Sequence, residues 1–99
     1  MTDLVLVKIY MEESEESLNE VLRILHDEIK VQHTVVLRAI EGFEKDGKMH
    51  SSHFLSLSLD LPLVLEFFDT DEKTSSALKK IQETGIKGHI LKLPVHALS

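Results

Sequence analysis

The sequence predicts a single α+β domain, and three observations lead to this fold class. The chain has 99 residues, enough for one domain with its own core, and 42% of them are apolar and 28% charged, as in an ordinary globular fold. Apolar residues recur with a period of two in some segments and of 3.6 in others, so both strands and helices are expected. Along the chain these segments follow the order β-α-β-β-α-β.

The first half of the chain predicts a strand, a helix and a second strand. Residues 4–11 are dense in Val, Ile and Leu, which is typical of a strand. Ser17 and Glu20 have capping-box spacing, which predicts that a helix begins at Ser17. The apolar stripe of this helix consists of Leu18, Val21, Leu22, Leu25 and Ile29. Residues 33–43 are rich in β-branched residues and predict the next strand.

The second half predicts further strands around a second helix. Residues 51–60 alternate Leu with Ser like a half-buried strand, but so short a run does not fix the assignment. Residues 61–68 are a clearer strand, and Asp69 can cap the helix that follows. Residues 86–95 predict the last strand, broken by Pro94. This order is that of a ferredoxin-like β-α-β-β-α-β sandwich, an antiparallel sheet with two helices on one face.

Both faces of the first predicted strand are apolar. Alternate residues point to opposite sides, with Val5, Val7 and Ile9 on one side and Leu4, Leu6 and Tyr10 on the other. Two helices cover only one face of such a sheet, and a large exposed apolar face is abnormal for a soluble monomer. We therefore expect a homo-oligomer in which the open sheet faces pack inward.

Charge and composition exclude several classes of function. Asp and Glu number 17 against 11 Lys and Arg, so the net charge is −6 and the broad basic surface of a nucleic-acid-binding protein is absent. The absence of cysteine excludes disulfides, iron–sulfur clusters, thiolate zinc sites and cysteine nucleophiles. No apolar stretch approaches a membrane span and no secretory signal is recognised, so we expect a cytoplasmic protein that does not insert into membranes.

Residues 42–48 match the phosphate-cradling pattern Gly-x-x-x-x-Gly-Lys. Met49 stands where a Ser or Thr hydroxyl must hold magnesium, so this is not expected to be a nucleotide-hydrolysing loop. Two interpretations stay open. The segment is a solvated hairpin loop, or its Lys45 and Lys48 contact the phosphates of a ligand without hydrolysing them.

Histidines near this loop are the candidate metal ligands. His50 and His53 could share a divalent metal, with Asp46, Glu44 or His89 completing the site, and solvated loop histidines are the alternative. Ser51 and Ser52 lack the Gly-x-Ser-x-Gly elbow of a hydrolase, and no third member of a triad is identified. We therefore do not expect an enzyme.

Two further features are candidates for anion binding. Arg38 is a charge within an apolar strand, so it must reach solvent, a carboxylate such as Glu66, or a ligand. Residues 84–89 place glycines and a lysine between the second helix and the last strand. That composition can form a backbone anion nest, and an ordinary helix-terminating turn needs the same glycines.

Three segments resemble a bacterial and archaeal family of uncharacterised PII-like proteins. They are Leu37-Arg38-Ala39-Ile40-Glu41-Gly42-Phe43, Met49-His50-Ser51-Ser52 and Leu57-Ser58-Leu59-Asp60-Leu61-Pro62-Leu63-Val64-Leu65-Glu66. The family patterns run Leu-Arg-Gly-Ile-x-Gly-Phe-Gly, Ile-His-Thr-Ser and Leu-Ser-x-Asp-Leu-Pro-Val-Val-Ile-Glu. The resemblance implies a ferredoxin-like subunit, a homotrimer similar to nitrogen-regulatory PII proteins, and a signalling role.

The resemblance also implies where an effector and a partner would bind. In PII proteins a long loop touches target proteins and nucleotide lies between subunits near its base, and the corresponding stretch here is residues 44–53. Thr84-Gly85 and Gly88 resemble the phosphate-binding loop of PII proteins, without its Gly-Asp-Gly-Lys continuation. The implied ligand is a small anionic effector such as an adenine nucleotide, and the implied partner is an unknown target protein such as a membrane transporter or channel. The candidate ligand-binding residues are Arg38, Gly42, Phe43, Lys45, Lys48, Thr84, Gly85, Lys87 and Gly88.

Two alternatives stay open. The first is a metal-responsive trimer similar to the CutA proteins of the same superfamily, which would bind divalent metal through His50, His53 and His89. The second is a small α+β-barrel enzyme acting through a histidine, which is disfavoured because no matched acid–base pair accompanies the histidines.

Overall fold

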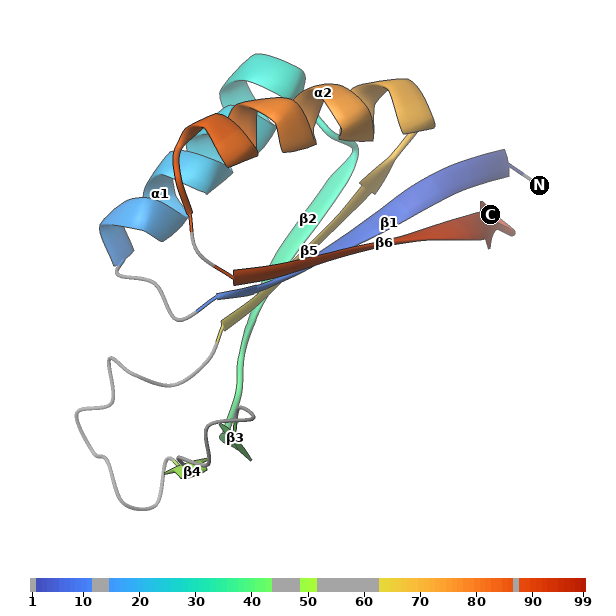
Figure 1. The fold of residues 1–99 in the computed structure, drawn as a ribbon. Helices are drawn as coiled ribbons and strands as arrows, with labels where there is room; N and C mark the ends of the chain where they lie inside the picture. Colours follow the sequence, from blue (N-terminus) through green and yellow to red (C-terminus); the bar gives the residue numbers. More distant parts are fainter. Residues whose placement is uncertain (1, 12–14, 44–48, 52–62, 87) are drawn as a thin grey trace.

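The computed structural model describes residues 2–11, 15–43, 49–51, 63–86 and 88–99, and they form the predicted ferredoxin-like sandwich (Figure 1). The helices lie together on one face of the main sheet. In chain order the elements are β1 (Thr2–Met11), α1 (Glu15–Arg23), the π-helix η1 (Ile24–Ile29), β2 (His33–Arg38), β3 (Glu41–Phe43), β4 (Met49–Ser51), β5 (Leu63–Asp69), α2 (Asp71–Glu83) and β6 (Gly88–Ala97).

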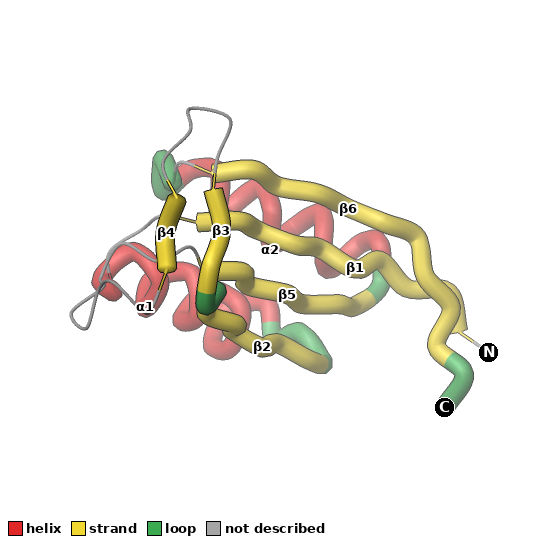
Figure 2. The backbone as a smooth tube through the Cα atoms, turned by 90° about the horizontal axis from the view of Figure 1, so that it is seen from below, coloured by secondary structure: helices red, strands yellow, loops and turns green. Residues whose placement is uncertain are grey.

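The main sheet has four antiparallel strands in the order β2-β5-β1-β6. Both helical connections cross over one strand: α1 and η1 lead from β1 past β5 to β2, and α2 leads from β5 past β1 to β6. β3 and β4 form a separate two-stranded hairpin. Figures 1 and 2 place this hairpin beyond one end of the main sheet, on the side away from the helices.

The core lies between the helices and the face of the sheet that they cover. Strand residues of alternating positions meet the apolar stripes of the helices there, as period-two and 3.6-period patterns require. The most deeply buried of them are Val7, Ile9, Met11, Leu65 and Phe67 from the sheet and Val21, Leu25, Ala77 and Ile81 from the helices.

The first helix begins earlier than predicted, and its last part, which ends at Ile29 as the apolar stripe predicts, is a π-helix. α1 begins at Glu15, so Ser17 lies inside the helix and the prediction that the helix begins there is wrong. The predicted stripe through Ile29 continues into η1, where the amide of Lys30 donates to the carbonyl of Leu25. Lys30 ends the helix in the left-handed conformation, at φ 61° and ψ 54°.

The strands also differ from the predicted boundaries. The strand expected over residues 33–43 is divided, because β2 ends at Arg38 and β3 begins at Glu41. Of the strand expected over residues 51–60, only Ser51 is described, as the last residue of β4, and residues 52–60 lie outside the described residues. The strand expected over residues 61–68 is β5, from Leu63 to Asp69.

Two single-residue predictions in the second half are wrong. Thr70, not Asp69, is the N-cap of α2, and its hydroxyl accepts a hydrogen bond from the amide of Lys73 at 3.3 Å. Pro94 does not break β6, which runs through it to Ala97 with Pro94 opposite Val5. Because β6 is an edge strand, the missing amide of proline can face away from the sheet.

Glu28 connects the two helical segments at the surface. Its carboxylate accepts a hydrogen bond from Lys80 Nζ on α2 at 2.9 Å and lies 2.9 Å from Arg23 Nη1 on α1. These contacts with Lys80 and Arg23 hold the pKa of Glu28 below its usual range. Within the described residues, no helix has the length and hydrophobicity needed to cross a membrane.

Candidate functional site

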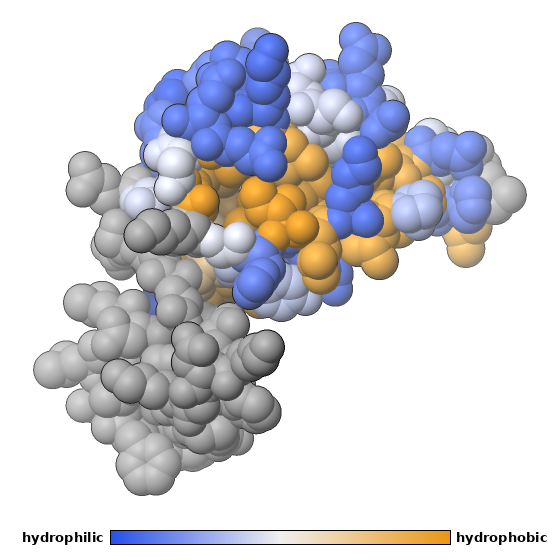
Figure 3. Space-filling model, in the orientation of Figure 1, coloured by the Kyte–Doolittle hydropathy of each residue, from blue (hydrophilic) through white to orange (hydrophobic). Residues whose placement is uncertain are grey.

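The face of the main sheet that the helices leave uncovered is largely apolar. Directly opposed residues of an antiparallel ladder share a face, so the strand register defines its members. We call this surface the open face; it consists of His33, Val35 and Leu37 of β2, Val64, Glu66 and Phe68 of β5, Leu6, Lys8 and Tyr10 of β1, and His89, Leu91 and Leu93 of β6. Figure 2 looks onto the open face, with the helices behind the strands, and Figure 3 shows apolar residues along the sheet below the polar helical layer.

Several large apolar side chains of the open face are exposed. The exposed fraction is 51% for Leu37, 49% for Leu91 and 40% for Leu93. At one corner the ring of His33 stacks on Phe68, with ring centroids 4.9 Å apart. The sequence predicted an apolar second face, and the structure confirms that the helices of this chain do not cover it.

A single ion pair lies in the middle of the open face among the described residues. Lys8 Nζ on β1 is 3.6 Å from Glu66 Oε2 on β5, and both strands are the central ones of the sheet. The side chains are partly exposed, at 32% for Lys8 and 26% for Glu66. Sequence reasoning did not single out this pair, although strand alternation places Lys8 with Leu6 and Tyr10 and could have identified it.

Several predicted ligand residues gather at one end of the sheet. Arg38, Leu63, Met11 and Gly88 lie opposite one another in a row across β2, β5, β1 and β6. The β3–β4 hairpin, with Gly42 opposite His50 in its register, extends beyond the same end (Figure 1). The structure therefore brings sequence-distant candidates to one end of the sheet, but places Arg38 and Gly88 on its opposite edges.

Arg38 does not pair with Glu66. Arg38 is opposite Leu63, a core residue, and so belongs to the helix-covered side, whereas Glu66 is on the open face with Lys8. Within the described part of the chain the Arg38 side chain has no ion-pair partner, and it is exposed. Of the destinations predicted for this charge, solvent and a ligand remain.

The Thr84–Gly85 turn has the hydrogen bonds of a helix end. The amides of Thr84 and Gly85 donate to the carbonyls of Ile81 and Gln82 at 3.1 Å, and the Thr84 hydroxyl donates to Ile81 at 2.6 Å. Gly85 has a φ of 77°, which closes the turn in the left-handed region. The amides of Thr84 and Gly85 are therefore hydrogen-bonded within the end of the helix, as in an ordinary helix-terminating turn, and the anion nest over residues 84–89 stays a prediction.

Gly88 is required by close packing against β1. Its φ is 155°, and a Cβ at this position would collide with the backbone carbonyl oxygen of Tyr10. The next residue, His89, lies opposite Tyr10 on the open face. Gly88 therefore has a structural reason to be glycine, whether or not a ligand approaches it.

The remaining predicted site residues lie outside the described residues or in the small hairpin. Lys45, Lys48, His53 and Lys87 belong to the first group. Gly42, Phe43 and His50 are in β3 and β4. Among the residues that the structure describes, no cluster of three or more His, Cys, Asp or Glu side chains could hold a metal ion. The roles given to all these residues stay predictions.

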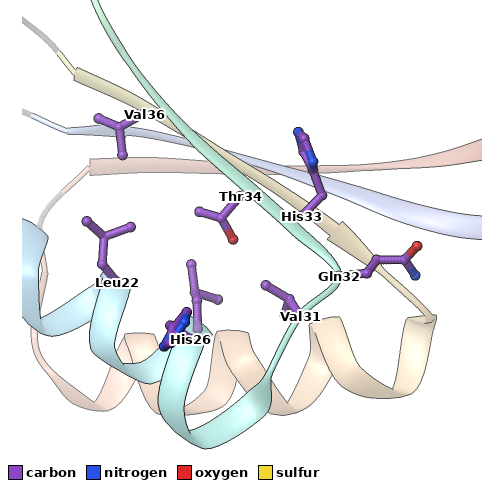
Figure 4. A pocket seen from close by; sticks show the side chains of 8 residues that line it. Leu22, His26, Val31, Gln32, His33, Thr34 and Val36 are labelled. Carbon is purple, nitrogen blue, oxygen red and sulfur yellow. The ribbon is translucent and has the colours of Figure 1, made fainter.

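A groove that the sequence did not predict lies between η1 and β2 (Figure 4). Its volume is about 410 Å³, and it is lined by Leu22, Leu25, His26, Val31, Gln32, His33, Thr34 and Val36. The apolar stripe of the helix predicts that Leu22 and Leu25 face the sheet. The groove itself also depends on how β2 lies beside η1, and the spacing of apolar residues in the sequence does not reveal that arrangement. Of the predicted ligand residues that are described, none lines this groove.

Comparison with protein families gives a match over almost the whole chain. The model of the family DUF190, described as "Uncharacterized ACR", matches residues 4–97. A UPF0166 protein of Aquifex aeolicus (strain VF5) is 38% identical over 80 residues, which span 81% of each chain.

Solved structures with the same fold include proteins of two kinds. CPII, a nitrogen regulatory PII-like protein from Thiomonas intermedia K12 bound to ADP, AMP and bicarbonate, has a TM-score of 0.72 at 16% identity, over 95% of this chain and 87% of its own. The divalent ion tolerance protein CutA1 from Ehrlichia chaffeensis has a TM-score of 0.67 at 13% identity, over 100% and 87%. At such identities the likeness shows a shared fold.

Proposed function

The chain belongs to the DUF190 family, and from that premise we propose that it is a PII-like regulatory protein rather than an enzyme. In this proposal, copies of the chain assemble as a homotrimer through the open face. A small anionic effector binds in clefts between copies, and residues 44–53 transmit its occupancy to a partner protein. A membrane transporter or channel is the kind of partner that the PII resemblance suggests.

The observation that carries the proposal is the uncovered open face. Exposed Leu37, Leu91 and Leu93 lie on a continuous sheet surface beside Phe68 and Tyr10. Contiguous apolar surfaces of this kind mark interaction sites in soluble proteins. Further copies of the same chain are the simplest cover, since homo-oligomers with closed symmetry are the commonest assemblies.

The arrangement of the candidate ligand residues supports a site between copies. Arg38 and Gly88 lie in the same row of paired residues, but on opposite edges of the sheet. Three strand spacings of ~4.8 Å separate their backbones by about 14 Å. One phosphate cannot touch both residues of a single subunit. In a closed ring, where unlike edges of neighbouring copies meet, Arg38 of one copy approaches the Gly88 end of the next.

The effector is tested by thermal unfolding with adenine nucleotides, cyclic nucleotides and divalent metals added separately. A ligand that binds the folded state raises Tm with concentration. We expect an adenine nucleotide to do so, as ADP and AMP are bound by the PII-like protein of Thiomonas intermedia. Folded protein whose Tm responds to no nucleotide would contradict nucleotide sensing.

Arg38→Ala is the variant that tests the ligand site. Arg38 is exposed and has no ion-pair partner among the described residues, so its removal should leave folding intact. Loss of a charge-assisted contact to an anion should weaken nucleotide binding about tenfold or more. Lys79→Ala on the exposed surface of α2 is the matched control and should bind like the unmodified protein.

A metal-responsive protein is the second candidate, because CutA1 proteins are among the structural neighbours. In that case a divalent metal, and no nucleotide, raises Tm in the same experiment. Stoichiometric metal binding that is lost in His50→Ala would favour this function, with His53 and His89 as the further ligands.

A further inference from the structure

Lys8 and Glu66 are a charged island at the centre of the open face. Lys8 lies between Glu66 and Leu91 across the strands, and Glu66 lies between Lys8 and Val35. Their neighbours along the same strands and on the same face are apolar: Leu6, Tyr10, Val64 and Phe68. Any partner that covers the open face must therefore also cover this pair.

Among the residues that the structure describes, Lys8 and Glu66 do not use all of their hydrogen-bonding capacity on each other. Its distance of 3.6 Å is longer than a hydrogen bond, and both side chains keep about a quarter to a third of their surface exposed. An ammonium has three donors and a carboxylate accepts several hydrogen bonds, so each group has capacity for a second partner of opposite charge.

The exclusion of water changes the energetics of the Lys8–Glu66 ion pair. An exposed ion pair contributes little to stability, because water solvates both charges almost as well. Once water is excluded, a charge without its counter-charge is strongly unfavourable. Docking orientations that bring like charges together or leave one charge alone are then rejected, whereas an apolar face without charges would tolerate many orientations.

We propose that Lys8 and Glu66 fix the orientation in which copies of this chain meet on the open face. The inference rests on the assembly proposed above. A surface with one cation and one anion in an apolar surround is complementary to a second copy of itself, when Lys8 of one copy approaches Glu66 of another. This self-complementarity identifies the occupant as further copies of the chain rather than a partner of one charge sign.

The test uses Lys8→Glu and Glu66→Lys, which make the central pair all acidic or all basic. Association constants are measured by sedimentation velocity over a dilution series of the full chain, separately and after mixing the two variants in equal amounts. We expect each variant alone to associate about a hundredfold more weakly or worse, because like charges would be buried together. A trimer that contains both variants has two complementary contacts and one contact between like charges, so the mixture should associate more tightly than either variant alone but less tightly than the unmodified protein.

Lys80→Glu is the matched control on the other layer. Lys80 and Glu28 form a shorter pair of 2.9 Å on the helical surface, so this variant breaks an ion pair without touching the open face. Its association should equal that of the unmodified protein. Circular dichroism checks that each variant is folded. If a charge-reversal variant does not fold, the association of Lys8→Met is measured in its place.

The outcomes separate this inference from the proposed function. If the unmodified protein is oligomeric and the Lys8 and Glu66 variants associate as tightly as it does, the orientation role is wrong and the assembly stands. The same conclusion follows if the mixture of the two variants associates no more tightly than each variant does alone. If the unmodified protein is a monomer at every concentration, the assembly itself is wrong.

Discussion

At the scale of single residues, Asp69 is a buried carboxylate that links the segment before β2 to the segment before α2. Its Oδ2 accepts a hydrogen bond from the amide of Gln32 at 2.8 Å, and its Oδ1 accepts one from the amide of Thr70 at 2.7 Å. Burial alone raises the pKa of Asp69, but the hydrogen bonds from Thr70 and Gln32 outweigh it and hold the pKa below the ordinary 3.8. The ionised carboxylate therefore stabilises both the segment that precedes β2 and the start of α2.

Asp69→Asn should lower the free energy of unfolding near pH 7 by about 1–3 kcal/mol, because buried amides lose a charged acceptor. Since the folded pKa is below the unfolded one, this stabilisation is present above about pH 4 and is lost as the pH falls through the folded pKa. Urea unfolding at several pH values measures both effects. Asp27→Asn, at an exposed carboxylate, should change stability little. An acid dependence of stability unchanged in Asp69→Asn would contradict this role.

The sequence identified charged residues better than it identified their partners. Alternation within β1 and β5 places Lys8 and Glu66 on the open face, but only the register shows that they are directly opposed. The same register separates Arg38 from Glu66, which the sequence left as a candidate pair. The hydrophobic pattern excludes a register shift of one residue, but it does not distinguish registers that differ by two residues, so the pairing of distant strands is not read from it alone.

At the scale of elements, the start of β6 is determined by contact with β1. Gly88 lies opposite Met11, and the carbonyl oxygen of Tyr10 occupies the position that a side chain at residue 88 would need. Gly85, three residues earlier, has a positive φ but nothing within 4 Å of its hypothetical Cβ. Close packing against β1 therefore requires glycine at position 88, whereas only the backbone conformation favours it at position 85.

Gly88→Ala should lower the free energy of unfolding by about 2–4 kcal/mol, because backbone strain and a clash with a backbone atom combine. Gly85→Ala should cost about 1–2 kcal/mol, since only the left-handed conformation is unfavourable for alanine there. Chemical unfolding of both variants measures the difference. Equal stabilities, or a larger loss in Gly85→Ala, would show that β6 does not pack against β1 as described.

Element types could be predicted from the sequence, and element ends could not. The stripe from Leu18 to Ile29 predicts a helical segment, but the same stripe fits α-helix and π-helix, so η1 was not foreseen. Asp69 and Thr70 are both good capping residues, and the hydrogen bond of Asp69 to Gln32, far away in sequence, decides between them. Tertiary contacts of this kind have no local signal.

At the scale of the whole molecule, the open face gives the short chain a reason to associate. The apolar character of both strand faces was visible in the sequence, and the helices cover only one of them (Figure 1). With a net charge of −6 per chain, an assembly repels anions overall, so an anionic effector must be held by local cations such as Arg38. Site and assembly are therefore expected to depend on each other.

The most direct measurement of this account is the mass of the protein in solution, by light scattering coupled to size-exclusion chromatography at micromolar concentration. Burial of the open face between copies predicts an oligomer, and the resemblance to PII proteins implies that it is a homotrimer, with a mass about three times the 11.3 kDa of the chain. A mass of 11.3 kDa throughout the concentration range would contradict the central claim, because the open face would then be exposed to water in the working protein.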